Sequence, residues 1–574
     1  MAVSRRTFLS ATAAATASVV AARPAAPVHA APEALPSREV IALNRMGFGP
    51  RAGDVARVRA MGLAAYIEEQ LQPQALDDAA CNGQLAAARL RISYGASTGY
   101  PARNEAAPLT LLDAPISTLW ARARYDVSVS WQERMRPWEE VRMATWLRAV
   151  YSKRQLLEVL ADFWHNHFNV NTSNDTGVAV SFPVYDREVI RGNALGTFRQ
   201  FLESVATSTA MLFYLDNRSN KTAGGEGSNE NFCRELFELH TLSADNYRRF
   251  DESAQIPVGT DGVALCYTDE DVYQAADCFS GWTVEQGRHW DSTAANTGAF
   301  YYDANWHDPD IKYVLNVRIP RNQPALSDGR KVLDLLAYHP GTARHLCTKL
   351  CRRLIADNPP TEVIDAATAK WLATQQAPDQ IRQVVRVILQ SEAFQTTWGQ
   401  KIKRPFEAAV SYLRATNAEL PTDAGTTGNA TPWNSMLWHY NQSGQRLFEW
   451  AAPTGHPDYA GYWATTNGLL KRWNLPYAME QEWGGRIVFG FMAQTNMQQS
   501  CVQIVDAWLE RLCGFSVSTS TRQALIDFMR QGKNATERPS AVSGPPEWND
   551  AAALTDRLAS MVQLIAMSPE FQQR

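Results

Sequence analysis

The sequence has few cysteines and lacks the motifs of several enzyme classes. Its eight cysteines in 574 residues are too few for a disulfide-stapled scaffold, and the absence of a C-x-x-C pair excludes a zinc ribbon. Neither G-x-x-x-x-G-K-[ST] nor H-E-x-x-H nor C-x-x-C-H occurs, which counts against P-loop NTPases, zincins and c-type cytochromes. Cys347 and Cys351 share a predicted helix face, where two buried thiols are expected and a disulfide or half a metal site are the alternatives.

Long hydrophobic runs and an excess of basic residues are also missing. No segment reaches about 18 uninterrupted apolar residues, so no permanent membrane anchor is expected. The 55 Lys and Arg against 59 Asp and Glu leave a formal charge of −4, which argues against a nucleic-acid partner because binding phosphates needs a positive field. With 45% hydrophobic residues, the chain is expected to fold around a large core.

The first thirty residues have the features of an export signal. Arg5 and Arg6 lie in a Ser-Arg-Arg-Thr-Phe-Leu pattern of the twin-arginine type, and a mildly apolar, uncharged stretch follows. The small residues around Ala30 fit cleavage after that position. We predict a twin-arginine signal peptide over 1–30 and a mature protein that is periplasmic or secreted. Because this route exports chains already folded, it favours a bound metal or other cofactor without naming one.

Helical periodicity predominates along the rest of the chain. Leu156, Leu160, Phe163 and His167 follow the i, i+4, i+7, i+11 stripe of an amphipathic helix. Such stripes predict further helices at 53–71, 136–151, 229–242, 269–281, 330–355, 361–373, 378–394, 403–416, 484–511, 520–531 and 551–567.

Strand patterns are few and short, and the best of them covers 312–319. We therefore predict a mainly α protein, a single large multi-helix domain over 31–574 with at most a small β element. The segment 417–434 marks a candidate sub-boundary. Linker-like composition is found at 217–229, 251–264, 286–299, 417–434 and 533–549.

Eight ordered strings along the chain together resemble one known family. They are Leu-Asn-Arg-Met-Gly-Phe-Gly-Pro at 43–50, Phe-Trp-His-Asn-His-Phe at 163–168, Tyr-Leu-Asp-Asn at 214–217, Asn-Glu-Asn-Phe-Cys-Arg-Glu-Leu-Phe-Glu-Leu-His-Thr-Leu at 229–242, Tyr-Thr-Asp-Glu-Asp-Val at 267–272, Gly-Trp-Thr at 281–283, Lys-Arg-Pro-Phe-Glu at 403–407 and Ser-Pro-Glu-Phe at 568–571. Their order and spacing are similar to those of the bacterial exported family catalogued as domain of unknown function number 1800, over roughly residues 38–574. The resemblance implies a helical exported protein, frequently encoded beside a sulfatase-like exported partner. The chain departs from the pattern by an insertion at 243–266.

The helix predicted at 229–242 carries the most polar cluster. Glu230 and Glu238 share one face with an arginine between them, and Glu235 and His240 flank that face. One interpretation is a solvated ladder of ion pairs. The apolar residues between these positions favour the other interpretation, in which some acids are buried, as general acid/base catalysis requires. We select all four residues as candidate catalytic residues.

His165 and His167 form the second candidate group. At i, i+2 on a helix their side chains diverge, so both can bind one metal only if the helix ends between them. His167 lies on the apolar stripe, where a hydrogen-bonded core histidine is the common case. If His165, His167 and His240 converged with Glu235 or Glu238, they would form a site for a divalent metal such as zinc or iron.

The string Trp-His-Asp-Pro-Asp at 306–310 forms a third cluster, and it matches a His-Asp-Pro element of the resembling family. Asp308 either caps a turn before Pro309 or, together with His307, forms a third wall of the same cleft. We keep His307 and Asp308 as candidate catalytic residues.

Tryptophan is frequent, with 18 in the chain. Trp164, Trp282 and Trp306 lie inside or beside the polar motifs. Most tryptophans are expected to be core or packing residues, but these three positions indicate a cleft whose ligand the sequence does not name. In a polysaccharide-active enzyme such indole rings would stack on sugar rings.

Two classes of function remain open. The first is an exported enzyme that acts on an extracellular polysaccharide through the candidate carboxylates and histidines, or, as a variant, a metal-dependent oxidoreductase or hydrolase built on the three histidines. The second is a non-catalytic partner or maturation factor for the sulfatase-like protein that the resemblance implies. A joint site requires that the motifs at 163–168 and 229–242 lie within about 15 Å of each other.

Overall fold

The computed structural model describes residues 35–222, 227–249, 255–288, 291–422, 432–480, 487–531, 534–539 and 551–574. The predicted signal peptide, with Arg5, Arg6 and Ala30, lies outside these residues. The prediction of a mainly α protein is confirmed, because helices predominate and every sheet in the described ranges has two strands. Within the same ranges, no helix combines the length and the apolar character needed to cross a membrane.

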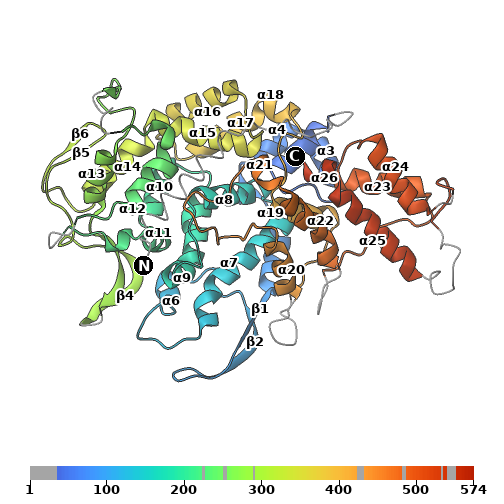
Figure 1. The fold of residues 1–574 in the computed structure, drawn as a ribbon, viewed down its shortest axis with the longest axis horizontal. Coiled ribbons are helices and arrows are strands. Elements are labelled where there is room, and N and C mark those ends of the chain that lie inside the picture. Colours follow the sequence, from blue (N-terminus) through green and yellow to red (C-terminus); the bar gives the residue numbers. More distant parts are fainter. Residues whose placement is uncertain are drawn as a thin grey trace, which may run out of the picture.

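The helices of the first half bring the polar motifs toward the centre of the molecule, where α8 lies in Figure 1. They are α2 (Arg38–Arg45), α3 (Asp54–Met61), α4 (Leu63–Gln70), α5 (Ala79–Ala87), α6 (Ile116–Trp120), α7 (Trp131–Tyr151), α8 (Gln155–His167), α9 (Thr176–Val184), α10 (Phe198–Ala206), α11 (Thr209–Tyr214), α12 (Asn231–Glu235) and α13 (Asp269–Phe279).

The helices of the second half cover α8 along one edge and extend the molecule at one end, where α23, α24 and α25 pack together (Figure 1). They are α14 (Ser327–Ala337), α15 (Pro340–Leu354), α16 (Thr361–Ala373), α17 (Gln380–Gln390), α18 (Glu392–Thr396), α19 (Pro405–Ala415), α20 (Pro432–Asn441), α21 (Ala460–Trp463), α22 (Thr466–Glu480), α23 (Cys501–Leu512), α24 (Thr519–Arg530), α25 (Ala551–Met567) and α26 (Pro569–Gln572).

One large hydrophobic core joins these helices, with buried side chains from Val40 to Phe571. Aromatic contacts connect distant segments, as between Trp146 of α7 and Phe406 of α19, whose ring centroids are 4.8 Å apart in an edge-to-face arrangement. All eight cysteines are buried free thiols, including Cys347 and Cys351 on α15. The core therefore depends on packing and not on disulfide bonds.

Three antiparallel hairpins supply the β structure. The segment of linker-like composition at 286–299 contributes to the longest hairpin through its described residues 286–288 and 291–299. Its cross-strand pairs include aromatic and β-branched residues, with Trp282 opposite Tyr302 and Val284 opposite Phe300. The strand predicted at 312–319 is itself a hairpin that turns at Leu315 and Asn316, both with positive φ. The strands are β1 (Arg89–Tyr94), β2 (Arg103–Pro108), β3 (Trp282–Arg288), β4 (Asp291–Tyr302), β5 (Lys312–Val314) and β6 (Val317–Ile319).

Several predicted helices differ from the observed ones. The stripe at 378–394 is divided at Ser391 into α17 and α18, and in the stripe at 484–511 the described residues become helical only at Cys501, where α23 begins. The stripe at 330–355 separates into α14 and α15 at Pro340, which lacks a backbone N–H and begins the second helix. The stripe at 53–71 separates into α3 and α4 at Gly62, whose φ of 84° is left-handed. The sub-boundary predicted near 417–434 falls partly on 423–431, outside the described residues.

Candidate functional site

The predicted helix at 229–242 changes its winding halfway. It begins as α12 and continues as a π-helix, η4 (Leu236–Thr241). The N–H of Leu242 donates to the carbonyl of Phe237, five residues earlier, at 2.9 Å. A π-turn takes up an extra residue, so the side chains after it are rotated relative to an α-helical face. As a result, His240 is fully buried whereas Glu235 and Glu238 keep partial exposure.

This winding removes the ion-pair ladder that the α-helical spacing suggests. Arg234 forms an ion pair with Asp269 of α13 at 2.9 Å and not with Glu238. Glu235 and Glu238 form no side-chain hydrogen bond or ion pair with any residue that the structure describes. Burial, together with the neighbouring Glu238, raises the pKa of Glu235 to about 7. Glu235 therefore holds a proton at neutral pH more readily than an ordinary glutamate does.

The motifs at 163–168 and 229–242 meet, as a joint site requires. The rings of His167 and His240 have centroids 6.0 Å apart, and His167 Nε2 lies 3.1 Å from the carbonyl oxygen of His240. On the other side of the His167 ring, Lys349 Nζ of α15 lies 2.8 Å from Nδ1. Burial and the charge of Lys349 hold the pKa of His167 well below its usual range. A neutral His167 that donates through Nε2 and accepts at Nδ1 satisfies both contacts.

His165 does not join this cluster, which corrects the prediction of one metal site on three histidines. Its Nε2 lies 2.9 Å from Asp186 Oδ1, and Asp186 also pairs with Arg148 and Arg191. The reason is the helical spacing, because α8 continues through His167 and directs i and i+2 side chains to different sides. Within the described ranges, no group of three or more His, Cys, Asp or Glu side chains is arranged to hold a metal ion.

His307 and Asp308 lie in a separate cluster beside the β3–β4 hairpin. His307 Nε2 is 3.3 Å from Asp328 Oδ2, and Lys312 Nζ is 2.9 Å from the same oxygen. The backbone N–H of Asp308 donates to Ser280 Oγ at 2.9 Å. These contacts connect the 303–310 turn to α14 and to the end of α13. The structure does not bring these two residues together with Glu235 or His167.

The tryptophan prediction is only partly right. Trp164 and Trp282 are fully buried, and the Trp164 indole donates to the carbonyl of Ala194 at 3.1 Å. Trp306 is half-buried. The first two are therefore core residues and do not line a cleft.

A pocket of about 280 Å³ opens beside His167. Lys349 and Arg352 of α15 line one side, and the segment 454–459 lines the other. Gly455 has a φ of 68°, and a Cβ there would lie 2.1 Å from the carbonyl oxygen of Asn166. Only glycine permits this segment to lie so close to the end of α8.

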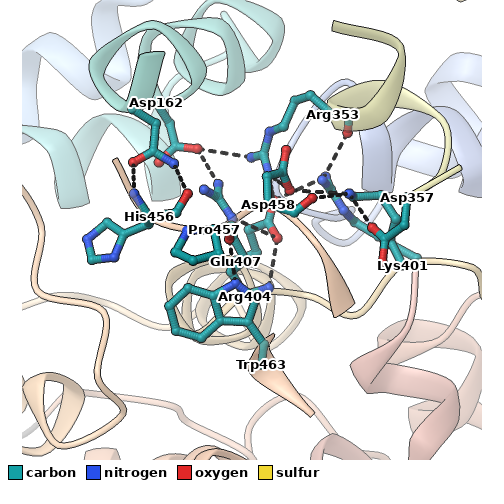
Figure 2. A network of polar contacts seen from close by, with 12 residues as sticks. Asp162, Arg353, Asp357, Lys401, Arg404, Glu407, His456, Pro457, Asp458 and Trp463 are labelled. Atoms are coloured by element: carbon teal, nitrogen blue, oxygen red, sulfur yellow. Dashed lines mark hydrogen bonds and ion pairs between the residues drawn. The ribbon is translucent and has the colours of Figure 1, made fainter. Parts of the chain in front are cut away.

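Charged side chains that adjoin the pocket, and that line it through Arg353, Arg404 and Asp458, form what we call the balanced network (Figure 2). Arg353 lies 3.0 Å from Asp162 and 2.5 Å from Glu407, and Lys401 lies 3.2 Å from Asp458. Burial alone would raise the pKa of Glu407, but Arg353, Arg574 and Arg404 hold it well below its usual range. The network contains four basic residues, Arg353, Lys401, Arg404 and Arg574, and four acidic residues, Asp162, Asp357, Glu407 and Asp458.

An aromatic group stands at the rim of the pocket. Tyr459, which lines the pocket, and Tyr462 have ring centroids 6.3 Å apart. Tyr462 lies 6.2 Å from Trp450. Tyr459 and Tyr462 are 51% and 39% exposed. These rings, and not the predicted tryptophans, offer stacking surfaces.

One family profile, that of the proteins of unknown function designated DUF1800, matches residues 41–573. The chain belongs to this family. No curated protein and no solved structure matches it.

Two motifs of this DUF1800 protein, those at 163–168 and 403–407, supply side chains that line the pocket. Arg404 and Glu407 come from the motif at 403–407, and Lys403 of the same motif lies 4.1 Å from the ring centre of Phe571 in the motif at 568–571. Sequence reasoning missed Lys349 and Arg352, which lie three residues apart on α15. Their spacing puts them on one face, but only the structure shows which acids are already paired with other bases.

One string has the sequence pattern of a nucleophile elbow. Gly-Ala-Ser-Thr-Gly at 95–99 has the G-x-S-x-G pattern. It forms the exposed turn between β1 and β2, where the N–H of Ser97 donates to the carbonyl of Tyr100 at 3.1 Å. A nucleophile elbow needs a strand-to-helix turn, so Ser97 is not placed as one.

Proposed function

We propose that this protein is an exported hydrolase that cleaves glycosidic bonds in an extracellular polysaccharide. The observation that carries the proposal is the carboxylate pair, Glu235 and Glu238. These residues flank the junction between α12 and the π-helix η4 and form no side-chain hydrogen bond or ion pair with the described residues, and burial together with Glu238 raises the pKa of Glu235 to about 7. A carboxyl group that keeps its proton near neutral pH, beside a second carboxyl group, is suited to acid and base roles in one site.

The proposed chemistry gives the two carboxyl groups different roles. Protonated Glu235 transfers its proton to the glycosidic oxygen as the bond from that oxygen to the anomeric carbon breaks. Ionised Glu238 accepts a proton from the water whose oxygen bonds to the anomeric carbon. Glu235 ends α12 and Glu238 lies three residues later in η4, so one short stretch of chain supplies both groups.

Two features support a polysaccharide as the substrate. The aromatic group of Trp450, Tyr459 and Tyr462 presents partly exposed rings at the pocket rim, a surface suited to stacking on sugar rings. The twin-arginine pattern predicts that the protein acts outside the cytoplasm, where such polymers are found. The sulfatase-like exported partner stays a prediction from the family resemblance, and a resident cofactor is not part of this proposal.

The segment 451–455 connects the carboxylate pair to the pocket. The Tyr214 hydroxyl, which Glu235 influences electrostatically, donates to the carbonyl of Ala451 at 2.9 Å. Thr454 and Gly455, three and four residues further on, line the pocket. His345 of α15 contacts the carbonyl of Leu239, next to Glu238, at 3.3 Å.

The test is the release of reducing ends from a panel of neutral and acidic polysaccharides by the mature chain. We expect cleavage of at least one polymer, a decrease of about 10²- to 10⁴-fold in Glu235→Gln and Glu238→Gln, and no change in Glu362→Gln, which alters an exposed acid on α16. Activity should decrease as the pH rises through about 7, where Glu235 loses its proton. Full activity in Glu235→Gln, or cleavage of no polymer in the panel, would contradict the proposal.

A further inference from the structure

The pocket beside His167 is lined by four basic side chains, Lys349, Arg352, Arg353 and Arg404, and one acidic side chain, Asp458. Arg353, Arg404 and Asp458 belong to the balanced network, and we call the other two, Lys349 and Arg352, the cationic wall. Lys349 Nζ contacts the uncharged His167 ring at 2.8 Å, and Arg352 Nε donates to the carbonyl of Asp357 at 3.1 Å. Neither residue forms an ion pair with a carboxylate in the described part of the chain.

The acids nearby are already paired with other bases. Asp458, the acid that attracts Lys349 most, lies 3.2 Å from Lys401 and 3.8 Å from Arg353. Asp357 lies 2.8 Å from Lys401 and also accepts the N–H of Ala460 at 2.6 Å. In the balanced network the four basic and four acidic side chains offset each other, so the cationic wall is an addition to a neutral set.

The two positive charges of the cationic wall destabilise the folded protein when no counter-ion is bound. Burial and Arg352 lower the pKa of Lys349 to about 8, because the two positive charges lie three residues apart on α15. An anion between them would relieve this repulsion, and the guanidinium and ammonium groups together match the oxygens of a carboxylate, sulfate or phosphate. The position is accessible, since both side chains keep partial exposure on the pocket wall.

We propose that the cationic wall is a binding site for an oxyanion group on the substrate, a carboxylate or a sulfate ester of a sugar. The substrate class is then an acidic polysaccharide, an assignment that rests on the proposed hydrolase. The aromatic group at the rim stacks on a sugar ring while Lys349 and Arg352 bind its acidic substituent. Since Lys349 must be protonated to bind, affinity decreases as the pH rises through about 8.

The experiment is calorimetric titration of the mature wild-type protein and of three variants at a fixed salt concentration near 0.15 M. The probes are an oligogalacturonate, a sulfated oligosaccharide, a neutral oligosaccharide of equal length, inorganic sulfate and inorganic phosphate. The variants are Lys349→Met, Arg352→Met and, as the matched control, Arg344→Met, which removes one positive charge from the exposed side of the same helix. Circular dichroism establishes that each variant is folded, and Lys349→Arg restores the charge.

We expect at least one acidic oligosaccharide to bind tenfold or more tightly than the neutral one. Lys349→Met and Arg352→Met should each weaken that binding at least tenfold, Arg344→Met should not, and Lys349→Arg should recover part of it. Equal binding of acidic and neutral probes, or an equal loss in Arg344→Met, would overturn the proposal. Binding of the inorganic ions alone would overturn the substrate class.

The outcome separates this site from the catalytic proposal. An acidic oligosaccharide that binds through Lys349 but is never cleaved contradicts the hydrolase and leaves the oxyanion site in place. Cleavage that is insensitive to Lys349→Met contradicts the oxyanion site and leaves the hydrolase in place.

Discussion

Two charged regions adjoin each other in this protein, and they are built differently. In the balanced network (Figure 2) each buried base has an acid within ion-pair distance, as between Arg353 and Asp162 at 3.0 Å. Lys349 and Arg352, which line the adjoining pocket, have no such acid, and Glu235 of α12 has no base, among the described residues. The paired charges hold segments of the fold together, whereas the unpaired charges of Lys349, Arg352 and Glu235 are kept at a cost, and for these three we propose that a ligand or a reaction compensates it.

Breaking the balanced network should have the largest effect. Glu407→Ala leaves Arg353 and Arg574 buried without their shared carboxylate, and we expect a loss of about 3–5 kcal/mol in the free energy of unfolding. Urea denaturation measures it. A loss below about 1 kcal/mol would show that these charges are not compensated as the structure indicates.

Removing a charge from the carboxylate pair should stabilise the folded protein, whereas removing one from the balanced network destabilises it. The pKa of Glu235 is raised from 4.5 to about 7 in the folded state, so the folded protein binds this proton more tightly and loses stability as the pH rises between these values. Glu235→Gln should match the wild type at pH 4.5 and exceed it by about 2 kcal/mol at pH 7.5, after allowance for partial exposure. Thermal unfolding across this pH range measures the difference, which a constant offset between the two proteins would contradict.

Removing the charge of Lys349 from the cationic wall should also increase the free energy of unfolding. The pKa of Lys349 is lowered from 10.5 to about 8, so its charge destabilises the folded state at pH 7, and this cost disappears as the pH rises from 8 toward 10.5. We expect Lys349→Met to gain about 1 kcal/mol in stability at pH 7 without ligand. The urea midpoints of variant and wild type at pH 7 and pH 10 show whether the gain shrinks as it should.

The smallest effect should come from an exposed pair. Arg344 and Asp365 lie 2.6 Å apart with side chains 52% and 58% exposed. Asp365→Asn should change the free energy of unfolding by less than about 0.5 kcal/mol. A larger change, measured by the same denaturation, would mean that exposure does not distinguish this weak ion pair from the buried pairs of the balanced network.

Much of the fold follows from the sequence, because helical stripes are a local signal. The stripe that includes Leu156 and Phe163 is α8, and its phase alone keeps His165 away from His167. The β3–β4 hairpin was missed because its residues have linker-like composition and pair only with each other.

The candidate site could be predicted from the sequence less completely than the fold. The α-helical spacing predicted that Glu238 lies beside Arg234. The π-turn at 236–241 rotates Glu238 away from it, and a π-turn has no signal in the hydrophobic periodicity of the sequence. The role of Lys349 depends on which bases are already paired with Asp458 and Asp357, and those pairs join residues more than forty positions apart.

The most direct measurement is the titration of Glu235 itself. Infrared difference spectra of the wild type against Glu235→Gln, recorded from pH 3 to pH 9, isolate the protonated carboxyl of this one residue. A midpoint near 7 is the expected result, since burial and Glu238 raise the pKa to about that value. A midpoint near 4.5 would mean that the carboxylate pair is ordinary surface charge, and the proposed acid and base roles would be wrong.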